Sequence, residues 1–354
     1  MWAWAFYDFS NTIFSVSILS FFFPVWLGDE LGAGAGAVNA AAALSAALVL
    51  LTAPAVGALA DLRQRRVPYL AALTLLACGL TAALDAAGGV VVAVALFLAA
   101  DLAYQSALVF YNALLPVVAA GRGAGRVSGY GTAAGYVGSI FALLVLTLFV
   151  ARGEEARALL GPLGWWLEPG ETGSNAFVPT AVLYLLFSLP AFFLVPDPRV
   201  REPRPGGLGR AYRDVISTVR SIRRYRGMAP FILATLLYTD AANTAIANMA
   251  LYGREVFGMQ SQDIRNLLLF STLFAVAGSF GCGLLSDRWG PRRALMAVLV
   301  LWLAAILLAA GALSAWMLYV AGPLVGAALG GTWTAGRPML VALSPPEKIG
   351  EFFG

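Results

Sequence analysis

The stretch GLLSDRWGPRR, residues 283–293, has a counterpart much earlier in the chain, GALADLRQRR at residues 57–66. In both stretches a glycine precedes an aspartate by four residues and a pair of arginines follows. A second matching pair reads D-x-x-N-T, at residues 8–12 and 240–244. Residues 57 and 283 are 226 apart, and residues 8 and 240 are 232 apart. Two independent matches at nearly one spacing are hard to obtain by chance, so the sequence predicts two related halves.

The chain around these motifs is strongly apolar. Hydrophobic residues make up 60% of its 354 residues and charged residues 12%, with a mean hydropathy of +0.79. A soluble domain carries about 25% charged residues. Apolar runs long enough to cross a bilayer recur along the chain, and in lipid they must be helical to satisfy their backbone groups. We predict an all-α integral membrane protein with ten spans, at about 2–27, 38–60, 67–86, 90–115, 129–151, 178–195, 228–252, 264–286, 294–312 and 315–340.

Several kinds of chemistry are disfavoured by the residues present. The chain has no histidine, and its two cysteines, Cys78 and Cys282, both fall inside predicted spans. We therefore expect no metal site, no cofactor and no disulfide framework. The chain also has no nucleotide-binding loop and no nucleophile motif, so an enzyme is not expected. The formal net charge is +4, but the basic residues lack the stacking platform of a nucleic-acid site, so no nucleic-acid partner is expected.

The arginines are distributed unequally between the loops. With the N-terminus in the cytoplasm, the outer loops hold only Arg152, Arg157, Arg254 and Arg265. The cytoplasmic loops hold all of the following: Arg63, Arg65, Arg66, Arg122, Arg126, the cluster from Arg199 to Arg226, Arg288, Arg292, Arg293, Arg337 and Lys348. This asymmetry predicts a cytoplasmic N-terminus. Abundant alanine, glycine and arginine favour a bacterial source, so we expect the protein in a bacterial cytoplasmic membrane. Its basic face should lie toward anionic lipid. A monomer is expected.

A cytoplasmic linker at 196–227 divides the chain into an N-terminal bundle of six spans, 1–195, and a C-terminal bundle of four, 228–354. The linker begins with a proline- and arginine-rich stretch. Apolar residues then recur at helical spacing among arginines: Tyr212, Val215, Ile216, Val219 and Ile222. This pattern predicts an amphipathic helix on the inner membrane surface. A short regulatory domain is the alternative interpretation.

The loop at residues 283–293 resembles the loop signature of the major facilitator superfamily, and residues 57–66 are a weaker copy. More narrowly, the chain is similar to the vacuolar amino-acid effluxer-like branch, the autophagy-related effluxer and its bacterial relatives. The stretches that carry this resemblance are WAFYDFSN (4–11), VFYNALLP (109–116), GYGTAAGYVG (129–138), YGREV (252–256) and EFFG (351–354). The resemblance covers essentially the whole chain and implies two helical bundles related by a parallel repeat.

The same resemblance implies twelve spans, of which ten are present. EFFG at 351–354 resembles the loop that precedes an eleventh span, so we expect this chain to be a C-terminally truncated fragment. A native protein of ten helices is the alternative.

The resemblance to the family implies that the two loop copies act as a latch, that is, as contacts that stabilise one access state of the transporter. A carboxylate at a helix end can pair with arginine and can favour the start of a neighbouring helix, and the glycines permit close approach. For Asp61 the resemblance implies docking on the eleventh helix, which this chain lacks. The alternative is that the arginines only enforce topology. The latch residues are Gly57, Asp61, Arg65, Arg66, Gly283, Asp287, Arg288, Arg292 and Arg293.

Three acidic residues fall inside predicted spans, where a charge costs several kcal/mol. Asp101 lies near the middle of the fourth span and Asp240 near the middle of the seventh, whereas Asp8 lies nearer the cytoplasmic end of the first. Each is a candidate for proton coupling; the alternative is that each merely holds helices together. Polar residues on the same helix faces are candidate solute contacts, expected to line a cavity between the halves: Asn11, Thr12, Tyr104, Gln105, Asn112, Asn243, Thr244 and Asn248.

The sequence thus predicts a secondary active transporter that works by alternating access. By resemblance its substrate is a small polar organic solute, with an amino acid as the first candidate, and the coupling ion is H⁺. An exporter of hydrophobic compounds and a non-transporting membrane sensor or scaffold are the alternatives.

Overall fold

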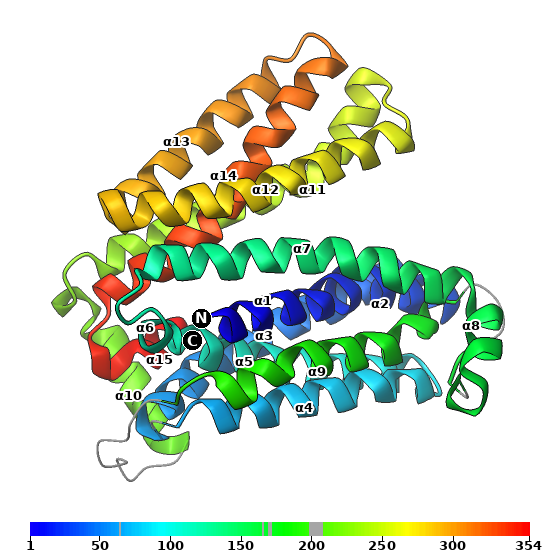
Figure 1. Cartoon of the computed structure of the whole chain (residues 1–354), viewed down its shortest axis with the longest axis horizontal. Helices are drawn as coiled ribbons and strands as arrows, with labels where there is room; N and C mark the ends of the chain where they lie inside the picture. The colour runs from blue at the N-terminus through cyan, green and yellow to red at the C-terminus, as the bar shows by residue number, and fades with distance from the viewer. Residues whose placement is uncertain (64, 165, 169–171, 198–207) are drawn as a thin grey trace. The chain divides into compact units, whose positions relative to one another are not determined.

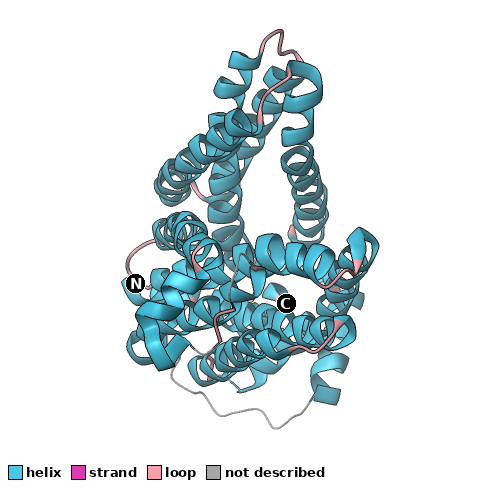
Figure 2. Cartoon of the chain, turned by 90° about the vertical axis from the view of Figure 1, so that its right-hand side faces the viewer, coloured by secondary structure: helices cyan, strands magenta, loops and turns pink. Residues whose placement is uncertain are grey.

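The computed structural model describes residues 1–354 except 64, 165, 169–171 and 198–207. Every regular element among the described residues is a helix, and they contain no strand (Figure 2). This agrees with the predicted all-α class.

Nine helical segments of the described chain are long and apolar enough to cross a membrane. They are Trp2–Glu30, Gly34–Leu62, Val67–Ala86, Val90–Val118, Ala124–Ala151, Gly173–Leu194, Ser261–Trp289, Pro291–Ala310 and Ala315–Leu343. The remaining predicted span, 228–252, lies within helix α11 (Met228–Phe257), which is 30 residues long. Helix α11 is not among the nine, because its polar residues lower its mean hydropathy.

The helices of the first half of the chain follow the predicted spans closely. They are α1 (Trp2–Phe14), α2 (Phe22–Val25), α3 (Gly34–Arg63), α4 (Val67–Ala83), α5 (Val90–Ala113), α6 (Leu115–Val118), α7 (Ala124–Ala151), α8 (Gly153–Leu160) and α9 (Phe177–Leu194). The first span is not uniform: α1 continues into a π-helical segment, Ser15–Phe21, and a second one, Trp26–Glu30, follows α2. Such segments hold an extra residue per turn and mark local irregularity in a helix.

The linker and the second half of the chain are also helical. Their helices are α10 (Leu208–Arg220), α11, α12 (Ser261–Trp289), α13 (Pro291–Ala310), α14 (Ala315–Leu343) and α15 (Ile349–Phe353). Helix α10 confirms the helix predicted in the linker, whose proline-rich stretch at 198–207 lies outside the described residues. Ala211 on α10 is buried against Ala58 and Leu62 of α3.

The described chain forms two compact units. Unit 1 comprises Met1–Val118, Val137–Val215 and Lys348–Gly354, and unit 2 comprises Ala119–Tyr136 and Ile216–Glu347. The predicted boundaries at 195 and 228 follow chain order, whereas the contacts group the first part of α7 with unit 2 and the end of the chain with unit 1. Helices in different parts of the sequence can share one packed unit, so hydropathy alone does not give this division.

Within unit 1, α4 packs against α5 and α9, α1 packs against α9, and α3 packs against α5 and α15 (Figure 1). Aromatic side chains fill the space between these helices. The Trp4 and Tyr111 rings stack with centroids 4.4 Å apart, and the Phe23 and Phe97 rings stack at 4.4 Å. The first helix is therefore a buried component of this unit.

Within unit 2, α12 packs along α14, and α13 packs against both (Figure 1). The Trp302 indole of α13 donates a hydrogen bond to Thr332 Oγ1 of α14 at 2.9 Å. Near the start of α12, Ile264 and Leu267 form a buried cluster with Met259 and Leu318. These contacts fix the three helices as one packed group.

Candidate functional site

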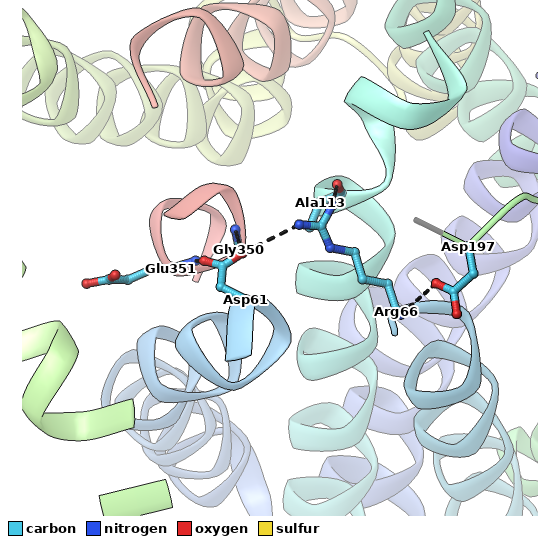
Figure 3. Close-up of polar contacts among 6 residues, drawn as sticks. All are labelled: Asp61, Arg66, Ala113, Asp197, Gly350 and Glu351. Atoms are coloured by element: carbon cyan, nitrogen blue, oxygen red, sulfur yellow. Dashed lines mark hydrogen bonds and ion pairs between the residues drawn. The ribbon is translucent and has the colours of Figure 1, made fainter. Parts of the chain in front are cut away.

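Asp61, near the end of α3, binds the first turn of α15 with both carboxylate oxygens (Figure 3). The backbone N–H of Gly350 donates to Oδ1 at 2.8 Å, and that of Glu351 donates to Oδ2 at 2.8 Å. The first amides of a helix have no partner within the helix, and they favour a negative charge. The two bonds therefore attach the end of the described chain to α3.

Gly57 makes this contact sterically possible. A Cβ atom at residue 57 would lie 2.1 Å from the carbonyl oxygen of Gly350, a distance that no real side chain tolerates. A Cβ at Gly350 would in turn lie 2.5 Å from the Gly57 carbonyl oxygen. The two backbones touch at this point, and only glycine fits at either position.

Arg66 is the buried positive charge beside Asp61. Its Nη2 lies 3.5 Å from Asp61 Oδ1, both side chains being 10% exposed. Figure 3 shows its side chain reaching from beside Asp197 toward Asp61 and Ala113, whose carbonyl oxygen accepts a hydrogen bond from Nη1. Burial lowers the pKa of the Arg66 guanidinium, and the Asp61 and Asp197 carboxylates oppose that effect.

Asp197 fixes the backbone at this corner of unit 1. Its Oδ1 accepts hydrogen bonds from the N–H of Arg66 at 2.7 Å and from the N–H of Val67 at 3.2 Å. Because α4 begins at Val67, the carboxylate caps the start of that helix. The neighbouring Arg65 is exposed, so only Arg66 of the predicted arginine pair joins the buried contact.

The resemblance implies that Asp61 docks on an eleventh helix, and among the described residues Asp61 binds the short helix α15. The partner is the pair of amides at the start of α15, from the EFFG region. The resemblance of residues 351–354 predicts a loop, whereas the structure has the short helix α15 there.

Asp287, at the matching position of unit 2, binds the start of α7. The N–H of Gly125 donates to Oδ1 at 2.8 Å, and the N–H of Arg126 donates to Oδ2 at 3.1 Å. The Arg126 side chain adds a charged contact from Nε to Oδ2 at 2.9 Å. Here too a carboxylate near a helix end holds the first amides of another helix.

Glycines again permit the close approach. Gly123 has a φ of +87°, and a Cβ there would lie 2.2 Å from Asp287 Oδ2. A Cβ at Gly283 would lie 2.8 Å from the carbonyl oxygen of Gly125. The predicted glycine of the signature therefore lies at a backbone contact in each unit.

The arginine that pairs with Asp287 was not among the predicted latch residues. Arg288, Arg292 and Arg293 are exposed, and the ion pair is made by Arg126, 161 residues away in sequence. A signal was present in the stretch GRGAGR at 121–126, where glycines precede a basic residue at the start of a span. The prediction considered only arginines close to Asp287 in sequence, whereas its partner, Arg126, lies on α7.

Asp101 lies at the middle of α5 and is 5% exposed. Ser45 of α3 donates a hydrogen bond to Oδ2, and Gln105 Nε2 donates to Oδ1 at 3.2 Å. Both partners are neutral, and among the described residues no arginine or lysine forms an ion pair with this carboxylate. Gln105 was predicted on the same face, whereas Ser45 comes from another helix and was not.

Asp8 on α1 is also buried, at 4% exposed. Asn11 Nδ2 donates to its Oδ1 at 3.1 Å, and the Thr12 hydroxyl donates to its backbone carbonyl at 2.7 Å. The D-x-x-N-T motif of the first half thus forms a local hydrogen-bonded group within one helix.

Tyr104 is buried on α5, where it stacks on Phe14 with centroids 4.5 Å apart and hydrogen-bonds Ser15. Asn112 is partly buried, and among the described residues its Oδ1 has no hydrogen-bond partner although the atom is shielded. These two predicted solute contacts therefore differ: the first is packed among aromatic rings, and the second keeps an unused acceptor.

A buried hydroxyl network beside Asp8 was not predicted. The Tyr7 hydroxyl lies 2.8 Å from Thr74 Oγ1 and 3.0 Å from the Tyr184 hydroxyl. Ser10 Oγ lies 2.8 Å from Ser188 Oγ. Tyr7 and Ser10, one helical turn apart in the opening motif, thus join α1 to α4 and α9, which gives the motif a packing role in addition to any role in transport.

The second D-x-x-N-T motif has different surroundings. On α11, Asp240, Asn243, Thr244 and Asn248 are all exposed. The Asn248 amide donates to the Thr244 carbonyl at 2.8 Å. The predicted polar face of this helix is present, but no described part of unit 2 buries it. Among the described residues, no group of three acidic, histidine or cysteine side chains could hold a metal ion.

Comparison with solved structures shows the fold. The chain is similar to the human organic anion transporter MFSD10 (TETRAN), with a TM-score of 0.70, 14% identity and coverage of 99% of this chain and 86% of that one. It is also similar to the E. coli fucose:proton symporter FucP, with a TM-score of 0.68, 18% identity and coverage of 99% and 84%. At these identities the likeness concerns the fold, which is that of the major facilitator superfamily.

Sequence relatives point the same way. An uncharacterized protein of Aquifex aeolicus (strain VF5) is 26% identical over 348 residues, covering 98% of this chain and 82% of its own length. The uncharacterized MFS-type transporter YxiO of Bacillus subtilis (strain 168) is 22% identical over 363 residues, covering 99% of this chain and 82% of its own length. The multidrug resistance protein MdtG of Salmonella paratyphi C is 27% identical over 213 residues, covering 58% and 50%. The fold, the spans and these relatives define a multi-pass secondary transporter and not an enzyme.

A family model identifies the family of this chain within that class. The profile of the family described as vacuole effluxer Atg22 like matches residues 33–354, and the chain belongs to this family. The resemblance inferred from the opening and loop motifs is thereby confirmed.

Proposed function

We propose that this chain moves a small polar organic solute across the membrane by alternating access, driven by protons, with Asp101 as the group that binds the coupling proton. An amino acid is the first solute to test, because the sequence resembles the vacuolar amino-acid effluxer-like branch. The arginine asymmetry supports a cytoplasmic N-terminus in a bacterial cytoplasmic membrane.

The observation that carries the proposal is the environment of Asp101. An ionised carboxylate buried in an apolar region is costly unless it is paired with a cation. Asp101 has two neutral hydrogen-bond donors and, among the described residues, no ion pair. A purely structural acid would be expected to have a positive partner, as Asp61 has Arg66. Binding a proton removes the cost, and release on exposure to water couples the proton to a conformational change.

The other two intramembrane acids have different proposed roles. Asp8 is held by Asn11 on its own helix, which supports a role in positioning the polar face of α1. Asp240 is exposed on α11 with Asn243 and Thr244, which supports direct contact with the solute. In this proposal the two faces contact solute, and Asp101 carries the proton.

The test is reconstitution of the chain in liposomes with a panel of labelled amino acids. Counterflow of at least one of them is expected for the wild type. The Asp101→Asn variant should retain counterflow, which needs no net proton movement, but should lose accumulation driven by a pH gradient by about tenfold or more. Glu154→Gln, which removes an exposed acid on α8, is the matched control and should accumulate solute normally.

Two outcomes contradict the proposal. Accumulation by Asp101→Asn at the wild-type rate, with unchanged pH dependence, would remove Asp101 as the proton site. Absence of counterflow across the panel and across organic anions and sugars would favour a membrane sensor or scaffold.

A second candidate function, export of hydrophobic compounds, is favoured by the similarity to the multidrug resistance protein MdtG over 58% of this chain. It predicts energised efflux of ethidium from loaded liposomes. The buried Asp8, Asp101 and Asn11 side chains make the interior of unit 1 more polar than such a substrate requires. Ethidium efflux without amino-acid counterflow would reverse the order of the two candidates.

A further inference from the structure

A cavity of about 530 Å³ lies where α10 ends and is lined by Ser217, Arg220, Ser221, Arg223 and Arg224. Helix α10 ends at Arg220, and a short 3-10 turn, Ile222–Arg224, follows. Because of this turn, Arg223 and Arg224 line the same cavity as Arg220, the last residue of the helix. All three arginines are exposed at this surface.

The side chains that line this cavity carry positive charge and no negative charge. Among the described residues, no carboxylate forms an ion pair with Arg220, Arg223 or Arg224. Arg210 at the other end of α10, by contrast, pairs with Asp214 at 3.9 Å. Three uncompensated guanidinium groups around one hollow attract an anion, and their planar N–H pairs match the oxygens of a phosphate group.

One of the two serines in the lining, Ser217, also fits this ligand. Ser221 Oγ donates to the carbonyl oxygen of Ser217 at 2.7 Å, which completes the last turn of the helix. The Ser217 side chain is exposed at the cavity wall, where a hydroxyl can donate to a phosphate oxygen. The lining therefore offers the Ser217 hydroxyl and the three guanidinium groups as hydrogen-bond donors, and its net charge is positive.

Two features select a membrane lipid over a soluble phosphate. Arg224 precedes the start of α11 at Met228 by four residues, so the cavity lies close to a helix long enough to cross the bilayer. The same helix that carries Arg220 exposes the apolar side chains of Tyr212, Ile216 and Val219 at helical spacing. An apolar face beside an arginine cluster is the arrangement that lies on an anionic membrane surface.

We propose that this cavity is a binding site for the phosphate headgroup of an anionic phospholipid, with Arg220, Arg223 and Arg224 as its ligands and the apolar face of α10 resting among the acyl chains. The site anchors the linker at the membrane surface. It is independent of the solute site, and the proposal does not rest on proton coupling.

Native mass spectrometry of the full chain in detergent, with added phosphatidylglycerol or with phosphatidylcholine of the same acyl chains, tests the proposal. The wild type should bind phosphatidylglycerol in preference to phosphatidylcholine. Replacing the three arginines together, Arg220→Gln, Arg223→Gln and Arg224→Gln, should weaken phosphatidylglycerol binding on the order of 100-fold, since each basic residue at an anionic surface contributes about fivefold.

The control is a second triple variant of the same segment and the same loss of charge: Arg210→Gln, Arg213→Gln and Arg226→Gln. These arginines do not line the cavity, so phosphatidylglycerol binding should fall clearly less than in the cavity variant, although the loss of charge is the same. A third variant with lysine at positions 220, 223 and 224 keeps the charge but not the paired N–H groups, and should bind with intermediate affinity.

Three results would overturn the proposal. Equal losses in the two glutamine variants would show that general charge, not the cavity, attracts lipid. Equal binding of the two lipids would exclude headgroup recognition. Displacement of phosphatidylglycerol by inorganic phosphate or glycerol 3-phosphate at equal concentration would assign the cavity to a soluble phosphate compound. A thermal melt of each variant identifies any loss that arises from unfolding, and the lysine variant then decides the question.

Discussion

Asp61 and Asp287 occupy matching positions in the two halves of the sequence, and each binds the two amides at the start of a helix. They differ in the arginine beside them. Arg66 follows Asp61 by five residues and is buried, whereas Arg126 reaches Asp287 from another helix and is 51% exposed. The feature common to both copies is thus the contact between carboxylate and helix start, and the position of the positive charge varies.

The D-x-x-N-T copies show a larger difference. Asp8 is buried among the helices of unit 1, and Asp240 is exposed on α11. Equal motifs therefore do not imply equal chemistry. A repeat predicts where a polar face lies along the chain, but the helices packed around it decide whether its acid is buried.

The largest difference between the two copies should come from removing the carboxylate charge. Asp61→Asn leaves Arg66 buried without its nearest negative partner, and this should cost about 3 kcal/mol of stability. Asp287→Asn leaves Arg126 in contact with water and should cost about 1 kcal/mol. Melting temperatures of the two variants in one detergent measure the difference. Equal losses would mean that the arginine contributes nothing beyond the amide contacts.

A smaller difference in stability is expected between alanine substitutions at Gly57 and at Gly283. Gly57→Ala places a methyl group 2.1 Å from a backbone oxygen, and Gly283→Ala places one 2.8 Å away. Overpacking typically costs about 1–3 kcal/mol, and the tighter site should lie at the upper end. Gly281→Ala, at a position with open space around it, is the control. A Gly57→Ala protein as stable as this control would contradict the close backbone contact between α3 and α15.

The smallest effect concerns salt. The Arg126–Asp287 pair is partly exposed, so it should contribute less than about 1 kcal/mol and weaken as ionic strength rises. The buried Arg66–Asp61 pair should be much less sensitive. The melting temperature of Arg126→Gln should be below that of the wild type at low salt, and the difference should shrink as the salt concentration is raised. A constant difference across that range would indicate that Arg126 acts through packing.

The sequence predicted the class of fold and most of the helices because apolar length and periodicity are local properties. It predicted Gln105 beside Asp101 for the same reason, since four residues place two side chains on one helix face. Ser45 and Arg126 could not be found in this way, because each lies on a different helix from the acid it binds. The same holds for Tyr7 with Thr74 and Tyr184.

The two packed units do not follow chain order. Helix α7 is one continuous span, Ala124–Ala151, but its first part packs with unit 2 and the rest with unit 1. Hydropathy marks such a helix only as a membrane span. Which neighbours it contacts depends on side-chain shape along its length, as with Gly129 against the Ser279 carbonyl and Gly138 against the Phe9 carbonyl.

In the proposed mechanism the coupling proton is carried by Asp101, a buried carboxylate of unit 1 that forms no ion pair among the described residues. The most direct measurement is proton flux in liposomes that contain a pH-sensitive dye, started by adding the amino acid with the strongest counterflow. The wild type should change the internal pH when solute is added, Asp240→Asn should do so in proportion to its residual transport, and Asp101→Asn should transport solute with no pH change. A pH change in Asp101→Asn equal to that of the wild type, per solute moved, would contradict the account.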